Sequence, residues 1–341
     1  MMAKVSIVMP AYNVEKYIAA AIDSIILQTY TDWELIIVDD CSTDKTINII
    51  EKYIKKDKRI TLIRRERNSG GCRRPRFDAI IAAKGDYICN IDSDDTIEKS
   101  YLEKLITRQQ ETNSDIVLSK IIICNELQEV GKTTIPKASY DLRKIMSGES
   151  ACKETIGEWK ISVSGWLAKA SICKSYIEKE CNYNFNGGFS DEVDQRKILL
   201  LADRVAMSDA YYFYRQQNNS IVHSTSVKFY DALIANKILF DFIITTFKDD
   251  ETLLIKMYDE YLEKVYRSQQ KYYTYIKQYN AQERKHIKSL IKESYLFIKK
   301  HEPEFSTKRN KILSTSYTLF RLYAWIVIFI VRIKLLFERS N

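Results

Sequence analysis

The fold is indicated most directly by the stretch WELIIVDD at residues 33–40, in which an apolar, β-branched run ends in two carboxylates. A second stretch of this kind, GDYICNIDSDD at residues 85–95, also ends in a cluster of acidic residues. Such runs are typical of buried strands in a parallel sheet, and open α/β sheets bind ligands at the carboxyl edge, where both clusters would lie. Carboxylates gathered there repel one another unless a cation or donor groups compensate. The simplest compensation is a hard divalent metal that holds nucleotide phosphates.

The order of the predicted elements indicates an α/β fold. We expect strands over 4–9, 33–38, 60–63, 86–91 and 115–124, and helices over 14–28, 75–83 and 96–111, with a further helix that Ser42 or Thr43 can cap. This alternation implies a Rossmann-like, mostly parallel sheet with helices on both faces. The pattern weakens from 126 to 157, where we expect a long loop or insertion, and order returns over 163–172 and in a helix over 194–202.

The character of the chain changes past residue 227, where strand-like runs disappear and Leu254, Tyr258 and Leu262 keep helical spacing. We therefore predict one α/β domain over 1–220 and a helical C-terminal region over 221–341. The composition is that of an ordinary folded protein, since 45% of the 341 residues are hydrophobic and 29% are charged.

The seven cysteines are scattered and form no CxxC pair, which favours free thiols in a reducing compartment over a disulfide framework or a zinc site. The three histidines are too few and too far apart for a metal motif that the sequence can show. The apolar run at 5–9 is too short for the core of a signal peptide, so we expect a strand there and no secretion.

The C-terminus is basic and strongly apolar. The net charge is +8, and residues 306–341 contain seven Lys or Arg and one Glu, which suits an anionic membrane surface or nucleic acid. Ten uninterrupted apolar residues, 322–331, lie between Arg321 and Arg332. This run is well short of the ~20 residues that span a bilayer, so we expect a membrane-surface helix within 317–337 and no nucleic-acid partner. A buried helix or a dimer contact, hence a homo-oligomer, is the alternative.

Several segments, taken in order, resemble the family 2 glycosyltransferases. They are VSIVMPAYNVEKYI at 5–18, IILQTY at 25–30, ELIIVDDCSTD at 34–44, the turn at 68–71, the Arg76 helix, and the Asp92-Ser93-Asp94 motif after a strand. The resemblance implies a GT-A fold, with a nucleotide-binding half over 1–125 and an acceptor half over 126–220. It implies inverting transfer of a hexosyl or N-acetylhexosaminyl group from a nucleotide donor, most simply a UDP-sugar. The acceptor would be a saccharide or lipid-linked precursor of a bacterial surface polysaccharide, on the cytoplasmic face of the membrane.

The donor site would be formed after the first two strands. Residues 10–13 follow the first strand, so that their backbone and the Tyr12 ring can form a wall for a flat base; a plain turn capped by Asn13 is the alternative. By resemblance the donor-binding residues here include Pro10, Tyr12, Asn13 and Glu15. Asp40 can accept a hydrogen bond from the imide N–H of uracil, with Asp39 beside it or bracing the backbone.

The metal site would be formed by the second acidic cluster. Asp92 and Asp94 point to one side of an extended segment and can approach a sugar and a diphosphate metal together. The resemblance places Mn²⁺ or Mg²⁺ on Asp94, with Asp92 and Ser93 nearer the donor and Asp95 as a further candidate. A solvated acidic loop is the alternative.

The segment Arg73-Arg74-Pro75-Arg76-Phe77 departs from the family pattern. Arg76 keeps the usual arginine position and is expected to hold the diphosphate, whereas Phe77 replaces the usual asparagine. Arg73 and Arg74 are additional; they would bind the diphosphate, bind an anionic acceptor, or form a basic surface cluster.

The general base is expected later in the chain. The segment before the predicted helix at 194–202 resembles the one that carries the general base in the family, and this resemblance implies that role for Asp191, with Glu192 as the substitute if the register is one residue off. Arg215 or His223 could touch the departing pyrophosphate, and Trp166 is either a platform for a sugar face or a core residue.

Three other classes of protein are alternatives to this resemblance. A nucleotidyltransferase needs a Gly-rich phosphate loop with Lys or Arg after the first strand, and the chain has Pro10–Asn13 there. A dinucleotide-dependent oxidoreductase needs a G-x-G-x-x-G near residue 10, which is absent. The altered segment 73–77 leaves open a catalytically degenerate GT-A scaffold or binding protein at the membrane.

Overall fold

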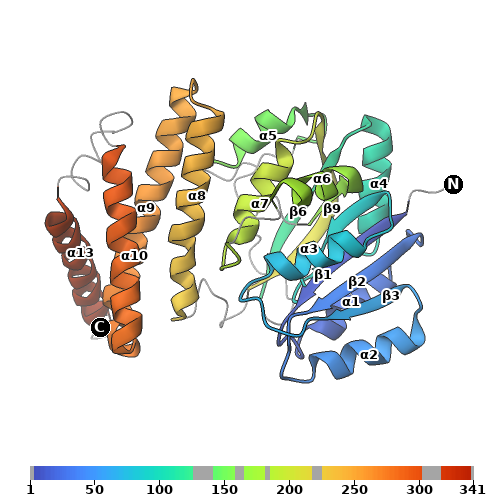
Figure 1. Cartoon of the computed structure of the whole chain (residues 1–341), viewed down its shortest axis with the longest axis horizontal. Coiled ribbons are helices and arrows are strands. Elements are labelled where there is room, and N and C mark those ends of the chain that lie inside the picture. Colours follow the sequence, from blue (N-terminus) through green and yellow to red (C-terminus); the bar gives the residue numbers. More distant parts are fainter. Residues whose placement is uncertain are drawn as a thin grey trace. The chain divides into compact units, whose positions relative to one another are not determined.

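The computed structural model describes residues 4–125, 141–157, 165–180, 185–216, 225–301 and 316–338, with the backbone alone for 330–338. The chain divides into two compact units, Met1–Ser220 and Ile221–Asn341 (Figure 1). His223 and residues 126–140 of the predicted loop lie outside the described residues. The described cysteines, all but Cys181, are free thiols, as predicted.

The first unit is built on a mixed sheet that has nine strands among the described residues (Figure 1). They are β1 (Val5–Ala11), β2 (Trp33–Asp39), β3 (Ile60–Arg64), β4 (Tyr87–Asn90), β5 (Thr96–Ile97), β6 (Ile116–Cys124), β7 (Ile145–Met146), β8 (Trp166–Lys169) and β9 (Val205–Arg215). The order is β3-β2-β1-β4-β8-β6-β9-β5, and β7 pairs with β9. The predicted parallel arrangement holds for β3-β2-β1-β4 and for β6-β9, whereas β8, β5 and β7 run antiparallel to their neighbours.

Seven described helices belong to this unit. They are α1 (Ile18–Ile26), α2 (Thr46–Lys56), α3 (Arg73–Ala82), α4 (Tyr101–Thr112), α5 (Gly148–Glu154), α6 (Ala170–Glu180) and α7 (Ser190–Leu199). The apolar spacing of α1 explains its packing, because Ile18, Ile22 and Ile25 are buried in one core with the β1 and β2 residues Ile7 and Leu35.

Two predicted helix starts in the first half of the unit are wrong. The helix expected from Thr96 begins at Tyr101, because Thr96 and Ile97 are β-branched and pair with β9 as the short strand β5. Neither Ser42 nor Thr43 caps α2. Instead, the Asp44 carboxylate accepts a hydrogen bond from the Thr46 N–H at 2.9 Å.

Two further differences concern the second half of the unit. The expected loop over 126–157 contains α5, which is capped by the Ser147 hydroxyl accepting from the Ser150 N–H. The helix expected from Asp194 begins four residues earlier, at Ser190, so Asp191 and Glu192 occupy its first turn. Acidic residues are favourable there because they complement the positive end of the helix dipole.

The second unit is helical, as predicted. Its elements are η1 (Val227–Tyr230), α8 (Asp231–Thr246), α9 (Glu251–Tyr275), η2 (Ile276–Gln278), α10 (Ala281–Lys300) and α13 (Tyr317–Glu338). Aromatic side chains fill its core, where Phe240 packs on Tyr261 and Phe320 packs on Tyr295. Within the part of the chain that the structure describes, no helix combines the length and apolarity needed to cross a bilayer.

Candidate active site

The candidate site lies at the carboxyl edge of β2, β1 and β4. These strands are parallel neighbours, so Asp39-Asp40, Tyr12-Asn13 and the acidic segment 92–95 follow strand ends at the same edge of the sheet. β1 extends two residues beyond its predicted end, so Pro10 lies within the strand opposite Val38. Tyr12 is 46% exposed just past this strand, which leaves its ring available to a ligand.

Asn13 and Glu15 connect the loops that follow β1 and β2. The Asn13 N–H donates to the Ser42 hydroxyl at 2.9 Å, and the Asn13 side-chain oxygen accepts from the Thr43 N–H at 2.7 Å. One Glu15 carboxylate oxygen accepts from the Lys45 N–H at 2.9 Å. Asn13 has a φ of 51°, a left-handed conformation that asparagine tolerates. Both residues therefore link the loop after β1 to the loop after β2 through hydrogen bonds that involve backbone N–H groups.

Asp39 and Asp40 are both buried, and their partners differ. One Asp39 oxygen accepts from the Ser42 N–H at 3.1 Å, and the other has no hydrogen-bond partner among the described residues. The Asp40 carboxylate accepts from the Ser69 N–H and hydroxyl and pairs with Arg65 at 3.1 Å. Asp39 therefore braces the backbone, which is one of the two alternatives that the sequence left open. Asp40 is held in place by the 68–71 loop and by Arg65.

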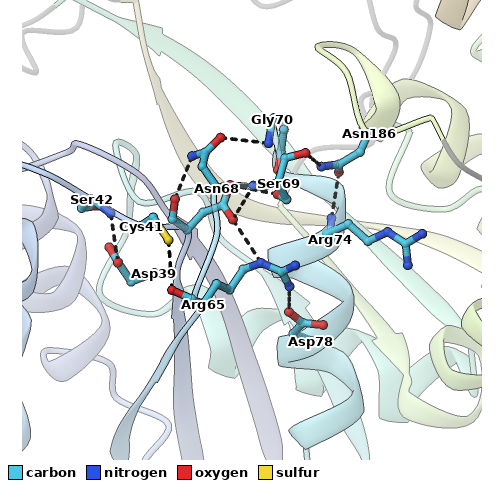
Figure 2. Close-up of polar contacts among 12 residues, drawn as sticks. Asp39, Cys41, Ser42, Arg65, Asn68, Ser69, Gly70, Arg74, Asp78 and Asn186 are labelled. Carbon is cyan, nitrogen blue, oxygen red and sulfur yellow. Dashed lines mark hydrogen bonds and ion pairs between the residues drawn. The ribbon is translucent and has the colours of Figure 1, made fainter.

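The 68–71 loop is held against the segment that precedes α7. Figure 2 shows Asn186 reaching both the Ser69 carbonyl, to which it donates, and the Arg74 N–H, from which it accepts at 3.0 Å. A Cβ on Gly71 would come within 2.1 Å of the Asn186 carbonyl oxygen, so only glycine permits this close approach. The Gly-rich turn therefore joins Asp40 to the segment that leads into the helix carrying Asp191.

The acidic segment after β4 is held in shape by β9. Asp95 is buried, where it accepts from the Tyr212 hydroxyl at 2.7 Å and from the Arg215 N–H at 2.8 Å. The Arg215 guanidinium donates to the Asp94 carbonyl at 2.8 Å, and the Asp92 N–H donates to Tyr212. Asp95 and Arg215 thus support the segment from behind. Burial, with added repulsion from Asp94 and Asp92, raises the pKa of Asp95 well above its usual range.

Asp92 and Asp94 fit a metal that is shared with a ligand. The described residues contain no group of three or more His, Cys, Asp or Glu side chains that could hold a metal ion by themselves. Mg²⁺ and Mn²⁺ that bind nucleotides need only one or two carboxylates, because phosphate oxygens and water complete the shell. Two partly exposed carboxylates on one segment suit such a cation, which would also relieve the repulsion that Asp95 experiences.

Arg76 joins this segment to α3. Its guanidinium pairs with Asp92 at 3.0 Å and donates to the Asn90 side chain at 2.8 Å. Burial by itself would lower the pKa of Arg76, but the neighbouring acidic groups, Asp92 and Asp191 among them, raise it overall. Arg76 therefore stays charged beside Asp92, and a direct contact with a diphosphate stays a prediction.

Asp191 lies in the first turn of α7, and its electrostatic environment includes Arg76 and Asp92. Burial raises its pKa, Arg76 opposes the shift, and Glu192 and Asp92 add to it, so Asp191 lies within electrostatic range of both Arg76 and Asp92. A carboxylate with a raised pKa in a ligand site suits a general base. Glu192 is directed to Arg196 on the next turn, at 3.5 Å, which favours Asp191 for this role.

Arg73 is not a ligand-binding residue. It is fully buried, and its Nε donates to both oxygens of Asp194 at 2.9 and 3.0 Å. Its guanidinium also lies 4.3 Å from the centre of the Phe77 ring, which makes an edge contact with Tyr176 on α6. The predicted diphosphate or acceptor contact is therefore wrong for Arg73, as is the basic surface cluster. Arg73 and Phe77 together explain the departure from the family pattern as a buried clamp between α3, α6 and α7.

Trp166 is not a sugar platform. It is 3% exposed on β8, which lies between β4 and β6 inside the sheet. It borders an apolar gap with Leu118 of β6 and with Ile198 and Leu199 of α7. Of the two predictions for Trp166, the structure therefore supports a residue of the packed core.

Five residues that hold the site together have no assigned role in the sequence prediction: Arg65, Ser69, Asn90, Asn186 and Tyr212. Ser69 lies in the turn at 68–71, which the order of the motifs does indicate. Arg65 and Asn186 carry no local signal, because each acts through a partner that is distant in sequence.

The parallel strands with acidic carboxyl ends and the supporting helices define a GT-A-type α/β unit. The profile of the family described as Glycosyl transferase family 2 matches residues 6–151. Residues 6–151 of the chain therefore form a glycosyl transferase family 2 domain, as the sequence motifs indicate.

Several characterised relatives are glycosyltransferases. The chain is 28% identical over 222 residues to the glycosyltransferase GlyG of Streptococcus pneumoniae, covering 64% of this chain and 73% of GlyG. It is 34% identical over 238 residues to the poly(ribitol-phosphate) beta-glucosyltransferase of Bacillus spizizenii, covering 67% of this chain and 36% of that protein. The chain thus spans about a third of the length of that transferase.

The fold is similar to that of TarS of Staphylococcus aureus, a poly(ribitol-phosphate) beta-N-acetylglucosaminyltransferase. The structure of TarS 1–349 in complex with UDP-GlcNAc superposes with a TM-score of 0.52 at 20% identity, over 88% of this chain and 92% of that one.

Proposed function

We propose that the chain is an inverting glycosyltransferase that moves a sugar from a UDP-linked donor to a hydroxyl group of a bacterial surface polysaccharide or its lipid-linked precursor. The observation that carries the proposal is the Arg76–Asp92 ion pair at the end of β4, together with the Arg73–Asp194 pair that ties α3 to the helix bearing Asp191. A charged arginine, a candidate metal ligand and a candidate base at one strand edge are what transfer from a nucleotide-sugar requires.

The donor pocket would be formed by the first acidic pair and the loop after β1. Asp40 would accept from the uracil imide, and the exposed Tyr12 ring would cover the base. The TarS structures with UDP and with UDP-GlcNAc support a donor of this kind for a similar fold.

Asp94, with Asp92 beside it, would hold Mn²⁺ or Mg²⁺. When bound, this cation would offset the negative charge of the diphosphate in the donor and in the departing UDP. The chain's own residues position the two carboxylates, through Arg76 on Asp92 and through Arg215 on the Asp94 carbonyl.

Asp191 would act as general base. The acceptor hydroxyl oxygen attacks C1 of the sugar on the face opposite the diphosphate, and Asp191 takes the hydroxyl proton. The new C1–O bond forms as the bond between C1 and the diphosphate oxygen breaks, and UDP leaves with the electron pair. A single displacement of this type inverts the configuration at C1.

The relatives suggest which substrates to test first. Their names include a glucosyl- and an N-acetylglucosaminyltransferase that act on poly(ribitol phosphate). We therefore infer UDP-glucose or UDP-N-acetylglucosamine as donor and a hydroxyl-bearing wall polymer as acceptor. Free thiols, two of them partly exposed, suit work on the cytoplasmic side of the membrane.

The test is UDP release from each of these donors, with and without poly(ribitol phosphate), in Mn²⁺ or Mg²⁺ and in excess chelator. We expect metal-dependent UDP release that the acceptor accelerates, together with transfer of the sugar. Binding of UDP with no turnover of any nucleotide-sugar would instead support the degenerate scaffold that the altered 73–77 segment leaves open.

A further inference from the structure

The outer face of α13 is broad and apolar. Six of its side chains are 40–52% exposed: Leu319, Leu322, Tyr323, Trp325, Ile326 and Phe329. At 100° per residue these positions form one continuous face that covers nearly half of the helix circumference. Trp325 and Phe329 stack on this face with ring centres 5.4 Å apart.

The inner face of α13 anchors the helix within the second unit. Phe320 and Ala324 are buried, and the Phe320 ring packs against Tyr266 of α9 and Tyr295 of α10. Tyr323, at the edge of the outer face, also packs on Tyr266 of α9, with ring centres 5.8 Å apart, whereas Trp325 and Phe329 stack on each other. Solvent-exposed apolar surface of this extent marks an interaction site.

The charges around this face have a single sign. From Ser306 to Phe337 the sequence contains no acidic residue, and Glu338 is the one acid before the end. The basic residues lie on either side of the 322–331 run: Lys308, Arg309, Lys311 and Arg321 before it, and Arg332, Lys334 and Arg339 after it. An apolar face between two basic flanks is complementary to the acyl and headgroup layers of an anionic membrane.

We propose that the outer face of α13 docks on an anionic lipid surface, with the helix lying in the plane of that surface. Trp325, Tyr323 and Phe329 suit the boundary between headgroups and acyl chains, because such rings have large apolar area and Trp and Tyr add a polar group. Docking would hold the transferase on the membrane face that carries a lipid-linked acceptor. This inference is independent of the transfer chemistry.

A second copy of the chain fits the face less well. In a parallel or an antiparallel pair of such helices, stretches of sequence rich in basic residues would adjoin one another, because the charged residues on both sides of the 322–331 run are all basic from Ser306 to Phe337. Both arrangements juxtapose like charges, which is unfavourable. Nucleic acid is also disfavoured, because the outer face itself presents aliphatic residues rather than cations.

The test is flotation of the full chain with vesicles of phosphatidylcholine alone or of phosphatidylcholine and phosphatidylglycerol in equal parts. We expect flotation with the anionic vesicles at low salt and little with the neutral ones. The double variant Trp325→Ala/Phe329→Ala should bind the anionic vesicles at least about tenfold more weakly than the parent, because it removes most of the aromatic area of the face. Leu296→Ala is the matched control, since Leu296 is 51% exposed on α10 and should leave flotation unchanged.

Three results would overturn the proposal. One is a parent protein that ignores anionic vesicles at low salt. Another is a double variant that floats as the parent does. The third is a parent protein that fails to float and forms a dimer in analytical ultracentrifugation, together with a double variant that is monomeric. That result would assign the face to a second copy of the chain. Unchanged thermal unfolding of both variants shows that the comparison concerns folded protein.

Discussion

Asp191 shows how a single residue links burial to chemistry. It lies in the first turn of α7, where burial raises its pKa and Arg76 limits the shift. An ordinary surface aspartate would be a weaker base, so the same burial that disfavours its charge suits it to accept a proton. Glu192, one residue later, instead pairs with Arg196 at 3.5 Å.

The first residue-scale prediction tests this assignment. Asp191→Asn should bind donor as the parent does but transfer sugar roughly 10²–10⁴-fold more slowly, the usual contribution of a general base. Steady-state kinetics with UDP affinity measured by calorimetry would separate the two effects. Glu192→Gln is the matched control and should stay near parental activity; the opposite pattern would move the role to Glu192.

The second residue-scale prediction concerns the pH dependence of stability, measured in the absence of metal and donor. Because the folded pKa of Asp191 is raised, the folded state binds this proton more tightly than the unfolded state, so ionisation of Asp191 destabilises the fold at high pH. Asp191→Asn should therefore unfold at a higher temperature than the parent at pH 8. The difference should shrink as pH falls through the raised pKa. A variant that is less stable than the parent at pH 8 would contradict the electrostatic account.

The third concerns the metal. Asp94→Asn removes an anionic oxygen ligand while keeping the Asp94 carbonyl that Arg215 uses, so the fold should persist. UDP binding in Mn²⁺ should weaken, and UDP binding in excess chelator should match the parent. Equal affinity of parent and variant for UDP in Mn²⁺ would show that the metal is not held here.

At the scale of elements, α3 connects the two sides of the site. Arg76 reaches Asp92 at the end of β4, and Arg73, one turn earlier, reaches Asp194 on α7. Asp194 lies one turn after Asp191, so the clamp fixes the helix that presents the proposed base. Phe77 completes it by lying under the Arg73 guanidinium.

The element-scale prediction is that Arg73→Met lowers the free energy of unfolding by about 3–5 kcal/mol, because it leaves the buried Asp194 carboxylate without its cation. Burial already raises the pKa of Asp194, and Arg73 opposes that shift. Urea denaturation would measure the loss. Arg74→Met on the same helix should change stability by no more than about 0.5 kcal/mol. Equal effects of the two variants would refute the clamp.

At the scale of the whole molecule, the two compact units divide the proposed work. The described site residues belong to Met1–Ser220, and the apolar outer face of α13 belongs to Ile221–Asn341. Each unit has its own core, with the mixed sheet in one and the aromatic helix packing in the other.

The whole-molecule prediction is that residues 1–220 alone bind UDP with Mn²⁺ at the affinity of the full chain but no longer float with anionic vesicles. Both follow if donor binding resides in the first unit and membrane docking in the second. Calorimetry and flotation on the same preparation would check them. A folded 1–220 fragment, judged by circular dichroism, that fails to bind UDP would show that the second unit contributes to the donor site.

The sequence by itself determined the α/β class, the strands β1, β2 and β4 with acidic residues after them, the family, and the helical C-terminal region. Short stretches of sequence determine these features, since a hydrophobic period, a turn or a contiguous motif each occupies only a few consecutive residues. The sequence also indicated that the acidic pair at 39–40 and the segment at 92–95 lie at the same edge of the sheet, because the carboxyl ends of parallel strands share an edge.

Only the tertiary structure decided which polar residues face a ligand and which support the site from within. Arg73 and Asp194 are 121 residues apart, Arg215 and Asp95 are 120 apart, and Asn186 and Ser69 are 117 apart. Burial and pairing of such residues depend on contacts between distant segments, which no local pattern contains. For that reason an arginine that looked like a phosphate ligand is the centre of a buried clamp, and a tryptophan that looked like a sugar platform packs inside the sheet.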